Sequence, residues 1–310
     1  MALDPAVKSV LDDLRAAGLP HPHQLSVPEA RQMMRSLKPV GPAPTVVGRV
    51  EDRDLPSSAG PLPVRLYWPE ALAPHPVIVY FHGGGFVLGD LDTHDGLCRR
   101  LCAGAQSLVI AVDYRLAPEQ PFPAALDDAL TATRWVQAHA VRLHGDATRL
   151  FVCGDSAGGN LAAMVCLRSR DVGAPRIRGQ LLFYPVTAHY DPPTPSYLEF
   201  ADHHFLTRES MRWFIDHYLG GASPDGAFPL AVPDLSGLPP AFIVTAECDP
   251  LRDEGRAYAE RLRAAGVPVA YRELTGMIHS CLSQTDLHPA AAAALQEVCA
   301  QFLRSENPRT

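Results

Sequence analysis

The segment Gly154-Asp155-Ser156-Ala157-Gly158 constrains this chain more than any other, because it lies between an apolar strand-like run and a helix-like run. A serine at such a junction must turn sharply through strained backbone, so the chain can pass only if its neighbours are small. Gly154 and Gly158 provide that space. The turn lifts the serine hydroxyl above the sheet at a helix N-terminus, which favours developing negative charge. Ser156 is therefore the candidate nucleophile, although Gly-x-Ser-x-Gly alone also fits a plain strand-to-helix turn.

A serine nucleophile requires a base within hydrogen-bond reach and a third group that orients the base. Most of the 13 histidines are interpreted as surface or core residues. His279 differs from them, because it follows the apolar strand Val267–Leu274 and a short turn at 275–278. Open α/β sheets build their sites at the carboxyl ends of strands. His279 is therefore the predicted base.

The orienting acid is sought at the end of the buried strand predicted for residues 241–246. Asp249 lies in the loop that follows, and Pro250 fits the first turn of a helix predicted from Leu251 to Ala265. Capping of that helix is the structural alternative for Asp249. Glu247 and Asp253 remain weaker candidates for the acid, because one is close to the strand end and the other is in the first helical turn.

A tetrahedral intermediate also requires donors for its oxyanion. His82-Gly83-Gly84-Gly85 directly follows the predicted strand at 76–81, and consecutive glycines let backbone N–H groups approach a substrate closely. A flexible surface turn is the alternative interpretation. We expect Gly84, Gly85 and Ala157 to donate, and His82 to brace the loop without acting as a second base.

Five motifs occur in an order that resembles one known family. They are His82-Gly-Gly-Gly85, Asp113-Tyr-Arg-Leu-Ala-Pro-Glu119, Gly154-Asp-Ser-Ala-Gly-Gly159, Asp249-Pro-Leu-Arg-Asp253 and Gly276-Met-Ile-His279. Together they resemble the hormone-sensitive-lipase-like carboxylesterases of the α/β-hydrolase fold, in the branch with Asp155 in the second elbow position. This chain has Ser280-Cys281 where that family has Gly-Phe.

The resemblance implies an eight-stranded, mostly parallel sheet with helices on both faces and a helical cap over the site. It assigns Ser156, Asp249 and His279 as the catalytic triad, with His82, Gly83 and Asp155 as supporting motif residues. It also implies hydrolysis of short- to medium-chain acyl esters through an acyl-enzyme, without a cofactor. An amidase or formamidase and a non-catalytic small-molecule receptor on the same fold are the alternatives, because one fold supports several functions.

The alternation of strand-like and helix-like runs along the 310 residues predicts one α/β domain with parallel crossovers. The helices predicted before residue 45 have no strand to accompany, and the alternation breaks again at about 188–225. Both segments are expected to form the cap. Val46–Arg53 and Pro63–Trp68 are predicted to start the sheet as an antiparallel pair, and Pro39–Pro44 is predicted to be a stiff linker.

Charge and cysteine content limit which partners and which cellular location we expect for this protein. A net charge of −7 without a Lys/Arg block argues against nucleic acid and against an anionic membrane surface, which favours a small-molecule ester substrate. No signal peptide or spanning run is evident, and seven scattered cysteines are typical of reduced core residues, so a cytoplasmic location is expected. Cys98 and Cys102 lack further ligands, and no metal site is predicted. An exposed edge strand would permit a homodimer.

The Asp113–Glu119 segment carries charged residues whose role must be distinguished from catalysis. We interpret Arg115 and Glu119 as structural, with the charges of the loop paired among themselves to fix a strand exit near the site.

Overall fold

A computed structural model describes residues 3–36, 44–202, 204–284 and 289–306. Its strands form one eight-stranded sheet in the order β1-β2-β4-β3-β5-β6-β7-β8. The strands are β1 (Arg49–Leu55), β2 (Leu62–Trp68), β3 (His75–Phe81), β4 (Leu108–Val112), β5 (Gly145–Asp155), β6 (Gly179–Phe183), β7 (Ala241–Cys248) and β8 (Val269–Ile278).

The sheet has the predicted α/β-hydrolase topology. β2 runs antiparallel to both β1 and β4, while the pairs from β3 and β4 through to β8 are parallel. The antiparallel start predicted from Val46–Arg53 and Pro63–Trp68 is therefore confirmed. Central strands such as β3 and β4 are buried along their whole length, as expected for a sheet covered on both faces.

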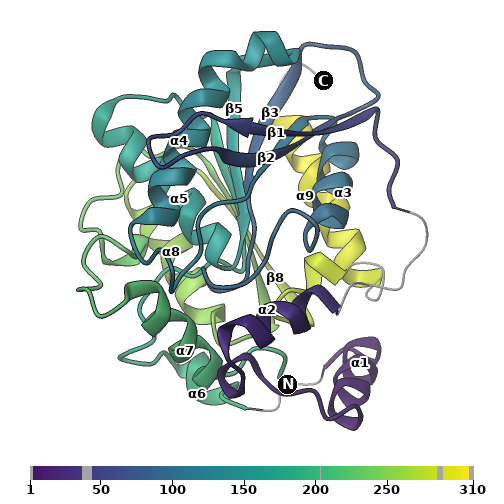
Figure 1. Ribbon diagram of the computed structural model, residues 1–310, viewed down its shortest axis with the longest axis vertical. Helices are drawn as coiled ribbons and strands as arrows, with labels where there is room; N and C mark the ends of the chain where they lie inside the picture. The colour runs from purple at the N-terminus through teal and green to yellow at the C-terminus, as the bar shows by residue number, and fades with distance from the viewer. Residues whose placement is uncertain (1–2, 37–43, 203, 285–288, 307–310) are drawn as a thin grey trace.

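Helices cover both faces of the sheet, and Figure 1 shows α4, α5 and α8 on one side with α3 and α9 on the other. The helices are α1 (Pro5–Ala16), α2 (Val27–Ser36), α3 (Asp95–Ala105), α4 (Ala124–His139), α5 (Ala157–Val172), α6 (Pro195–Glu199), α7 (Arg208–Leu219), α8 (Arg252–Ala264) and α9 (Pro289–Glu306), with short 3₁₀ turns η1 (Pro22–Gln24), η2 (Ala140–Leu143), η3 (Pro229–Ala231) and η4 (Cys281–Gln284). No helix in the described ranges is long and apolar enough to cross a membrane.

Apolar side chains form two clusters of buried residues. One cluster includes buried residues of α4, α5, α7 and α8, and the other includes those of α1, α3 and α9. The elements α2, α6 and α7 lie together at one end of the molecule, beyond β8 in the view of Figure 1. The 3₁₀ turn η1, which precedes α2, packs against α7. The two segments predicted to form a cap thus meet in space.

The helix α2 begins at Val27, directly after Ser26. The carboxylate of Glu29 accepts a hydrogen bond from the N–H of Ser26 at 3.0 Å, which satisfies a donor ahead of α2. The predicted linker Pro39–Pro44 lies outside the described residues except for Pro44.

Candidate active site

The turn between β5 and α5 has the strained geometry expected of a nucleophile elbow. Ser156 has φ 56° and ψ −117°, which a side-chain-bearing residue rarely adopts. A Cβ on Gly158 would lie 1.9 Å from the carbonyl oxygen of Phe81, and one on Gly154 would lie 2.2 Å from the backbone of Gly158. Glycine is therefore required on both sides of the serine, as the sequence predicted.

Three side chains from three different strand ends form one hydrogen-bonded chain. His279 Nε2 lies 2.9 Å from Ser156 Oγ, and His279 Nδ1 lies 2.7 Å from Asp249 Oδ2. An ionised carboxylate can only accept, so Nδ1 carries the proton of a neutral imidazole and Nε2 is free to accept from the serine hydroxyl. Asp249 is fully buried, while Ser156 and His279 remain 6% and 5% exposed.

Asp249 also performs the structural role considered for it. Its Oδ1 accepts the N–H of Leu251 at 2.9 Å, so the carboxylate holds the turn before α8 with one oxygen and His279 with the other. That helix begins at Arg252, so Pro250 lies in the preceding turn and not in the first helical turn. The cause is that the chain first closes a turn from Arg252 N–H to the carbonyl of Asp249.

The two weaker candidates for the acid have other partners. Glu247 accepts the N–H of Gly276 at 2.7 Å, and Asp253 accepts the N–H of Ser196 at 2.9 Å. Neither carboxylate bonds to His279 in the described chain.

The segment before His279 is strand and not the predicted turn. β8 continues through residues 275–278, and the register with β7 shifts between Ala246 and Cys248. Glu247 lies at this shift in β7. Its carboxylate accepts the N–H of Gly276 and so holds the irregular part of β8. The ring of Tyr184 lies 4.9 Å from the imidazole of His279, and Ser280 has φ 65°. The imidazole thus packs against an aromatic side chain from the end of β6.

The glycine-rich loop lies against both the sheet and α7. Gly84 and Gly85 have φ 112° and 62°, and a Cβ on Gly85 would lie 2.2 Å from the ring of Phe214. No turn or loop hydrogen bond in the described chain uses the N–H of Gly84 or Gly85. Ala157 is the first residue of α5, where backbone N–H groups have no partner within the helix.

The supporting motif residues form a buried network behind that loop. Asp155 Oδ1 accepts the N–H of Gly83 at 2.9 Å and the hydroxyl of Tyr80. Burial opposes ionisation of this carboxyl, but the nearby His94 and the Tyr80 bond hold the pKa of Asp155 below its ordinary value. Burial, followed by His94, lowers the pKa of His82 to about 4, so this imidazole is neutral near pH 7.

His82 lies within the network as bracing and not beside the hydroxyl of Ser156. Its Nδ1 is 2.7 Å from the carbonyl oxygen of Gly83, and its ring stacks on Tyr114 at 4.2 Å. Its described hydrogen bonds do not include Ser156.

The charges of the Asp113–Glu119 segment do not pair among themselves, and that interpretation was wrong. Arg115 forms a bidentate pair with Asp128 on α4, at 2.8 and 2.9 Å, and Glu119 pairs with Arg31 on α2 at 2.7 Å. The Asp113–Glu119 loop lies against α4 and α2, and each of these helices offers an opposite charge to one of its residues. Both residues remain structural.

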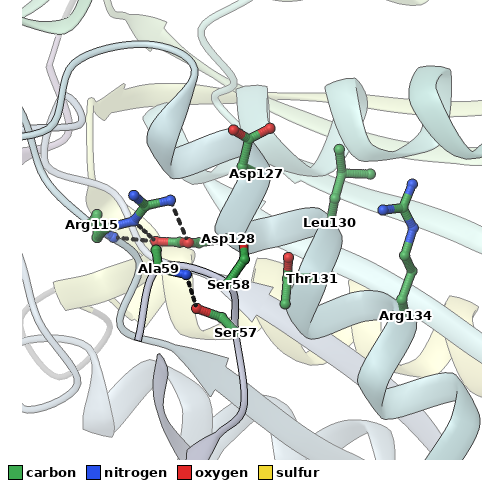
Figure 2. Close-up of a pocket in the computed structure, with 9 residues that line it drawn as sticks. All are labelled: Ser57, Ser58, Ala59, Arg115, Asp127, Asp128, Leu130, Thr131 and Arg134. Carbon is green, nitrogen blue, oxygen red and sulfur yellow. Dashed lines mark hydrogen bonds and ion pairs between the residues drawn. The ribbon is translucent and has the colours of Figure 1, made fainter. Parts of the chain in front are cut away.

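Figure 2 shows the Arg115–Asp128 pair at the wall of a pocket of about 370 Å³. The β1–β2 turn and α4 provide the other walls, and the lining residues are Ser57, Ser58, Ala59, Arg115, Asp127, Asp128, Leu130, Thr131 and Arg134. None of them belongs to the Ser156–His279–Asp249 chain, so this pocket is separate from the candidate site.

Sequence reasoning missed Arg31, which joins α2 to the core. It donates from Nε to the carbonyl of Val87 at 2.9 Å and from Nη2 to the carbonyl of Ala117 at 3.0 Å, in addition to its pair with Glu119. Val87 directly follows the glycine-rich loop and Phe86. No local pattern indicates which exposed-looking arginine of an amphipathic helix makes such a contact.

The polar groups of the described residues do not form a metal centre. Among residues 3–36, 44–202, 204–284 and 289–306, no group of three or more His, Cys, Asp or Glu side chains could hold a metal ion. All seven cysteines are buried and unpaired.

The chain is similar to known proteins over nearly its whole length. A family model described as the alpha/beta hydrolase fold matches residues 78–283. Esterase LipI of Mycobacterium tuberculosis is 43% identical over 306 residues, covering 94% of this chain and 92% of that protein. Ethyl acetate hydrolase of Pseudomonas putida is 38% identical over 299 residues, covering 90% and 92%.

Solved structures give the same result. A thermostable esterase from Pseudomonas putida superposes with a TM-score of 0.92 at 37% identity, covering 97% of both chains. A hyperthermophilic esterase from the archaeon Pyrobaculum calidifontis gives a TM-score of 0.90 at 36% identity, covering 99% of both. These names describe ester hydrolysis and do not favour the amidase or receptor alternatives.

Proposed function

This chain belongs to the α/β-hydrolase family, as a carboxylesterase of the hormone-sensitive-lipase-like type, and from that premise we propose that Ser156, His279 and Asp249 hydrolyse short- to medium-chain acyl esters. The observation that carries the proposal is the continuous hydrogen-bonded chain from the serine hydroxyl through the imidazole to a buried carboxylate. Acyl transfer requires a serine nucleophile, a neutral base beside it and an acid that orients the base, and these three residues are arranged in that way.

In the proposed mechanism, His279 Nε2 takes the proton of Ser156 as Oγ attacks the ester carbonyl carbon. The C=O π electrons move onto oxygen, and the tetrahedral intermediate collapses as the imidazolium gives its proton to the departing alkoxide. The alcohol leaves and an acyl-serine remains. Water, deprotonated by the same imidazole, then attacks the acyl carbon and releases the acid while Ser156 regains its proton.

The oxyanion is proposed to accept hydrogen bonds from Gly84, Gly85 and Ala157. The first two donors come from a loop with left-handed backbone that has no competing turn partner in the described chain, and the third is a free helix N-terminal N–H. Donors fixed before the reaction stabilise the developing charge without reorganisation.

The segments at about 1–45 and about 188–225 are proposed to form a cap on a single domain. The ring of Phe214 on α7 lies against Gly85, beside the proposed oxyanion donors. An apolar lid at this place excludes water and limits the length of the acyl chain. This supports water-soluble esters of moderate size as the substrates.

Partners and location complete the proposal. Seven buried, unpaired thiols are consistent with a reducing compartment, and we propose the cytoplasm. β1 and β8 are the two edges of the sheet, and a homodimer could form by pairing of an edge strand with its copy. The molar mass in solution, measured by light scattering, tests this last point.

The decisive experiment compares the wild-type protein with Ser156→Ala. The variant should fold normally, lose at least about a thousandfold in kcat on nitrophenyl butyrate, and no longer react with a fluorophosphonate probe. Matched ester and anilide substrates in the same assay measure the preference for esters. Comparable turnover by Ser156→Ala would remove this residue from the mechanism.

A further inference from the structure

Glu254 is a buried carboxyl that the proposed mechanism does not use. It lies in the first turn of α8 with no exposed surface. Its Oε1 accepts the N–H groups of Thr187 and Ala188, at 2.6 and 3.2 Å. Its Oε2 has no hydrogen-bond partner among the residues that the structure describes. Burial of such a group is costly, so its position calls for a physical reason.

The backbone that Glu254 holds passes directly beside the nucleophile. Val186 donates its N–H to the carbonyl of Ser156 at 3.1 Å, and the two residues that follow Val186 donate to Glu254. Thr187 also accepts the N–H of Leu230 at 2.9 Å. The second predicted cap segment, about 188–225, lies between Thr187 and Leu230 in the chain, so this bond brings its two ends together at a residue that Glu254 binds.

The helix that carries Glu254 begins at the loop of the proposed catalytic acid. Asp249 accepts the N–H of Leu251, and Asp253 accepts the N–H of Ser196 at the start of α6. The start of α8 is therefore bonded both to the acid and to the cap. Through Glu254 it is also bonded to the segment that contacts Ser156.

The charge of this carboxyl is set by its surroundings. Burial is the largest influence and raises the pKa of Glu254 to about 8, against the lowering effect of the two N–H donors. Asp249, from the acid loop, raises it further, whereas the nearby hydroxyl of Tyr197, from α6, lowers it. The hydroxyl of Tyr197 is itself buried without a hydrogen-bond partner in the described chain. A protonated carboxyl has an O–H to donate, whereas an anionic Glu254 would be repelled by the charge of Asp249.

We propose that Glu254 is a positioning residue that fixes the segment beside Ser156 relative to the loop of Asp249, and that it does so as a neutral carboxyl. This inference rests on the proposed roles of Ser156 and Asp249. Glu254 touches neither substrate nor reacting atoms, and it acts through the two backbone N–H groups that it binds.

The test compares Glu254→Ala, Glu254→Gln and the control Glu260→Ala, which removes an exposed glutamate from the same helix. Active sites are titrated with a fluorophosphonate, so that kcat on nitrophenyl butyrate refers to folded, reactive protein. Glu254→Ala should lower kcat at least about tenfold, with KM within about twofold, because a small misplacement of reacting groups is costly. Glu254→Gln keeps a neutral acceptor and should recover kcat to within about threefold. Wild-type kcat per titrated site in Glu254→Ala would overturn the positioning role.

The pH dependence tests the neutral state. Wild-type kcat should fall above about pH 8, as Glu254 ionises beside Asp249, whereas Glu254→Gln should lack this fall. The same alkaline fall in both proteins would overturn the neutral carboxyl. If Glu254→Ala does not fold, the comparison of wild type with Glu254→Gln is enough to test the proposal.

A stability measurement makes the result independent of catalysis. Between the ordinary pKa of 4.5 and the native pKa of about 8, the unfolded state ionises Glu254 and the native state does not. The native state then binds more protons, so wild-type stability falls as pH rises through that window. The Tm of Glu254→Gln relative to wild type should therefore increase from about pH 5 to about pH 8. A constant difference would contradict the proposal, whereas an inactive wild type would contradict the proposed function only.

Discussion

At the scale of single residues, the elbow depends on the absence of one methyl group. A Cβ on Gly158 would meet the backbone of Phe81 and His82, which are in β3 and directly after it and cannot rotate away. Gly158→Ala should therefore lower the free energy of unfolding by more than about 3 kcal/mol and abolish activity. Urea unfolding measures the loss.

The matched control is Gly96→Ala on α3. An added Cβ there would be no closer than 3.4 Å to the end of the flexible Arg100 side chain. Because alanine favours helix over glycine, this variant should gain up to about 1 kcal/mol. Equal stabilities for the two alanine variants would show that the crowding at the elbow is relieved by backbone movement.

Ser280 is a second residue whose backbone favours glycine. Its φ of 65° is in the left-handed region, where a Cβ costs about 1–2 kcal/mol. This cost explains why glycine suits the position after the histidine. Ser280→Gly should raise stability by up to about 1 kcal/mol, because glycine's larger entropy loss on folding offsets part of the relief. Ser280→Ala retains the Cβ and should show no gain, and thermal unfolding of both variants separates the two outcomes.

At the scale of elements, Arg31 bonds α2 to the core, in addition to the buried Ala30 of the same helix. The Arg31 side chain is 23% exposed and bonds to two carbonyls as well as to Glu119. The pair with the exposed Glu119 contributes little, but the carbonyl bonds are shielded, so Arg31→Ala should cost about 1–2 kcal/mol. If α2 belongs to the cap, KM for nitrophenyl butyrate should also rise more than kcat falls.

Arg35→Ala is the comparison for Arg31. Arg35 lies one turn later on α2, is 63% exposed and pairs only with Asp90 in the described chain. A surface pair of this kind contributes at most about 1 kcal/mol. Equal effects of the two substitutions on KM would argue against a special role for Arg31.

The elements also show what could be predicted from sequence. Ser156, Asp249 and His279 each follow an apolar strand, so a local pattern sufficed to place them at one edge of the sheet, and the strand predicted at 76–81 ends where β3 ends. The continuation of β8 through Thr275 was missed, because a register shift depends on the partner strand. The pair of Arg31 with Glu119 joins residues 88 positions apart, and neither helix periodicity nor motif spacing encodes such a contact.

At the scale of the whole molecule, the seven thiols report whether the chain unfolds as one unit. Cys166 belongs to the buried cluster on one face of the sheet, and the second cluster contains the others, which are Cys98, Cys102, Cys153, Cys248, Cys281 and Cys299. Burial raises the pKa of Cys102 to about 12 and that of Cys248 to about 11, and it raises the pKa of the other five thiols too. Since the thiolate is the reactive form, native protein should react very slowly with Ellman's reagent near pH 7.

Because both clusters share the central strands, a single cooperative domain should expose all seven thiols at one urea concentration. The number of reactive thiols is measured against urea concentration and compared with the loss of helix by circular dichroism. A variant with Cys166→Ala isolates the six thiols of the second cluster, and the difference from wild type gives the first cluster alone. If Cys166 reacted at a lower urea concentration than the other six, the face that carries α4, α5 and α8 would unfold on its own, and the single-domain proposal would be wrong. Coincident midpoints mean that the sheet transmits unfolding from one face to the other, as a sheet buried on both sides requires.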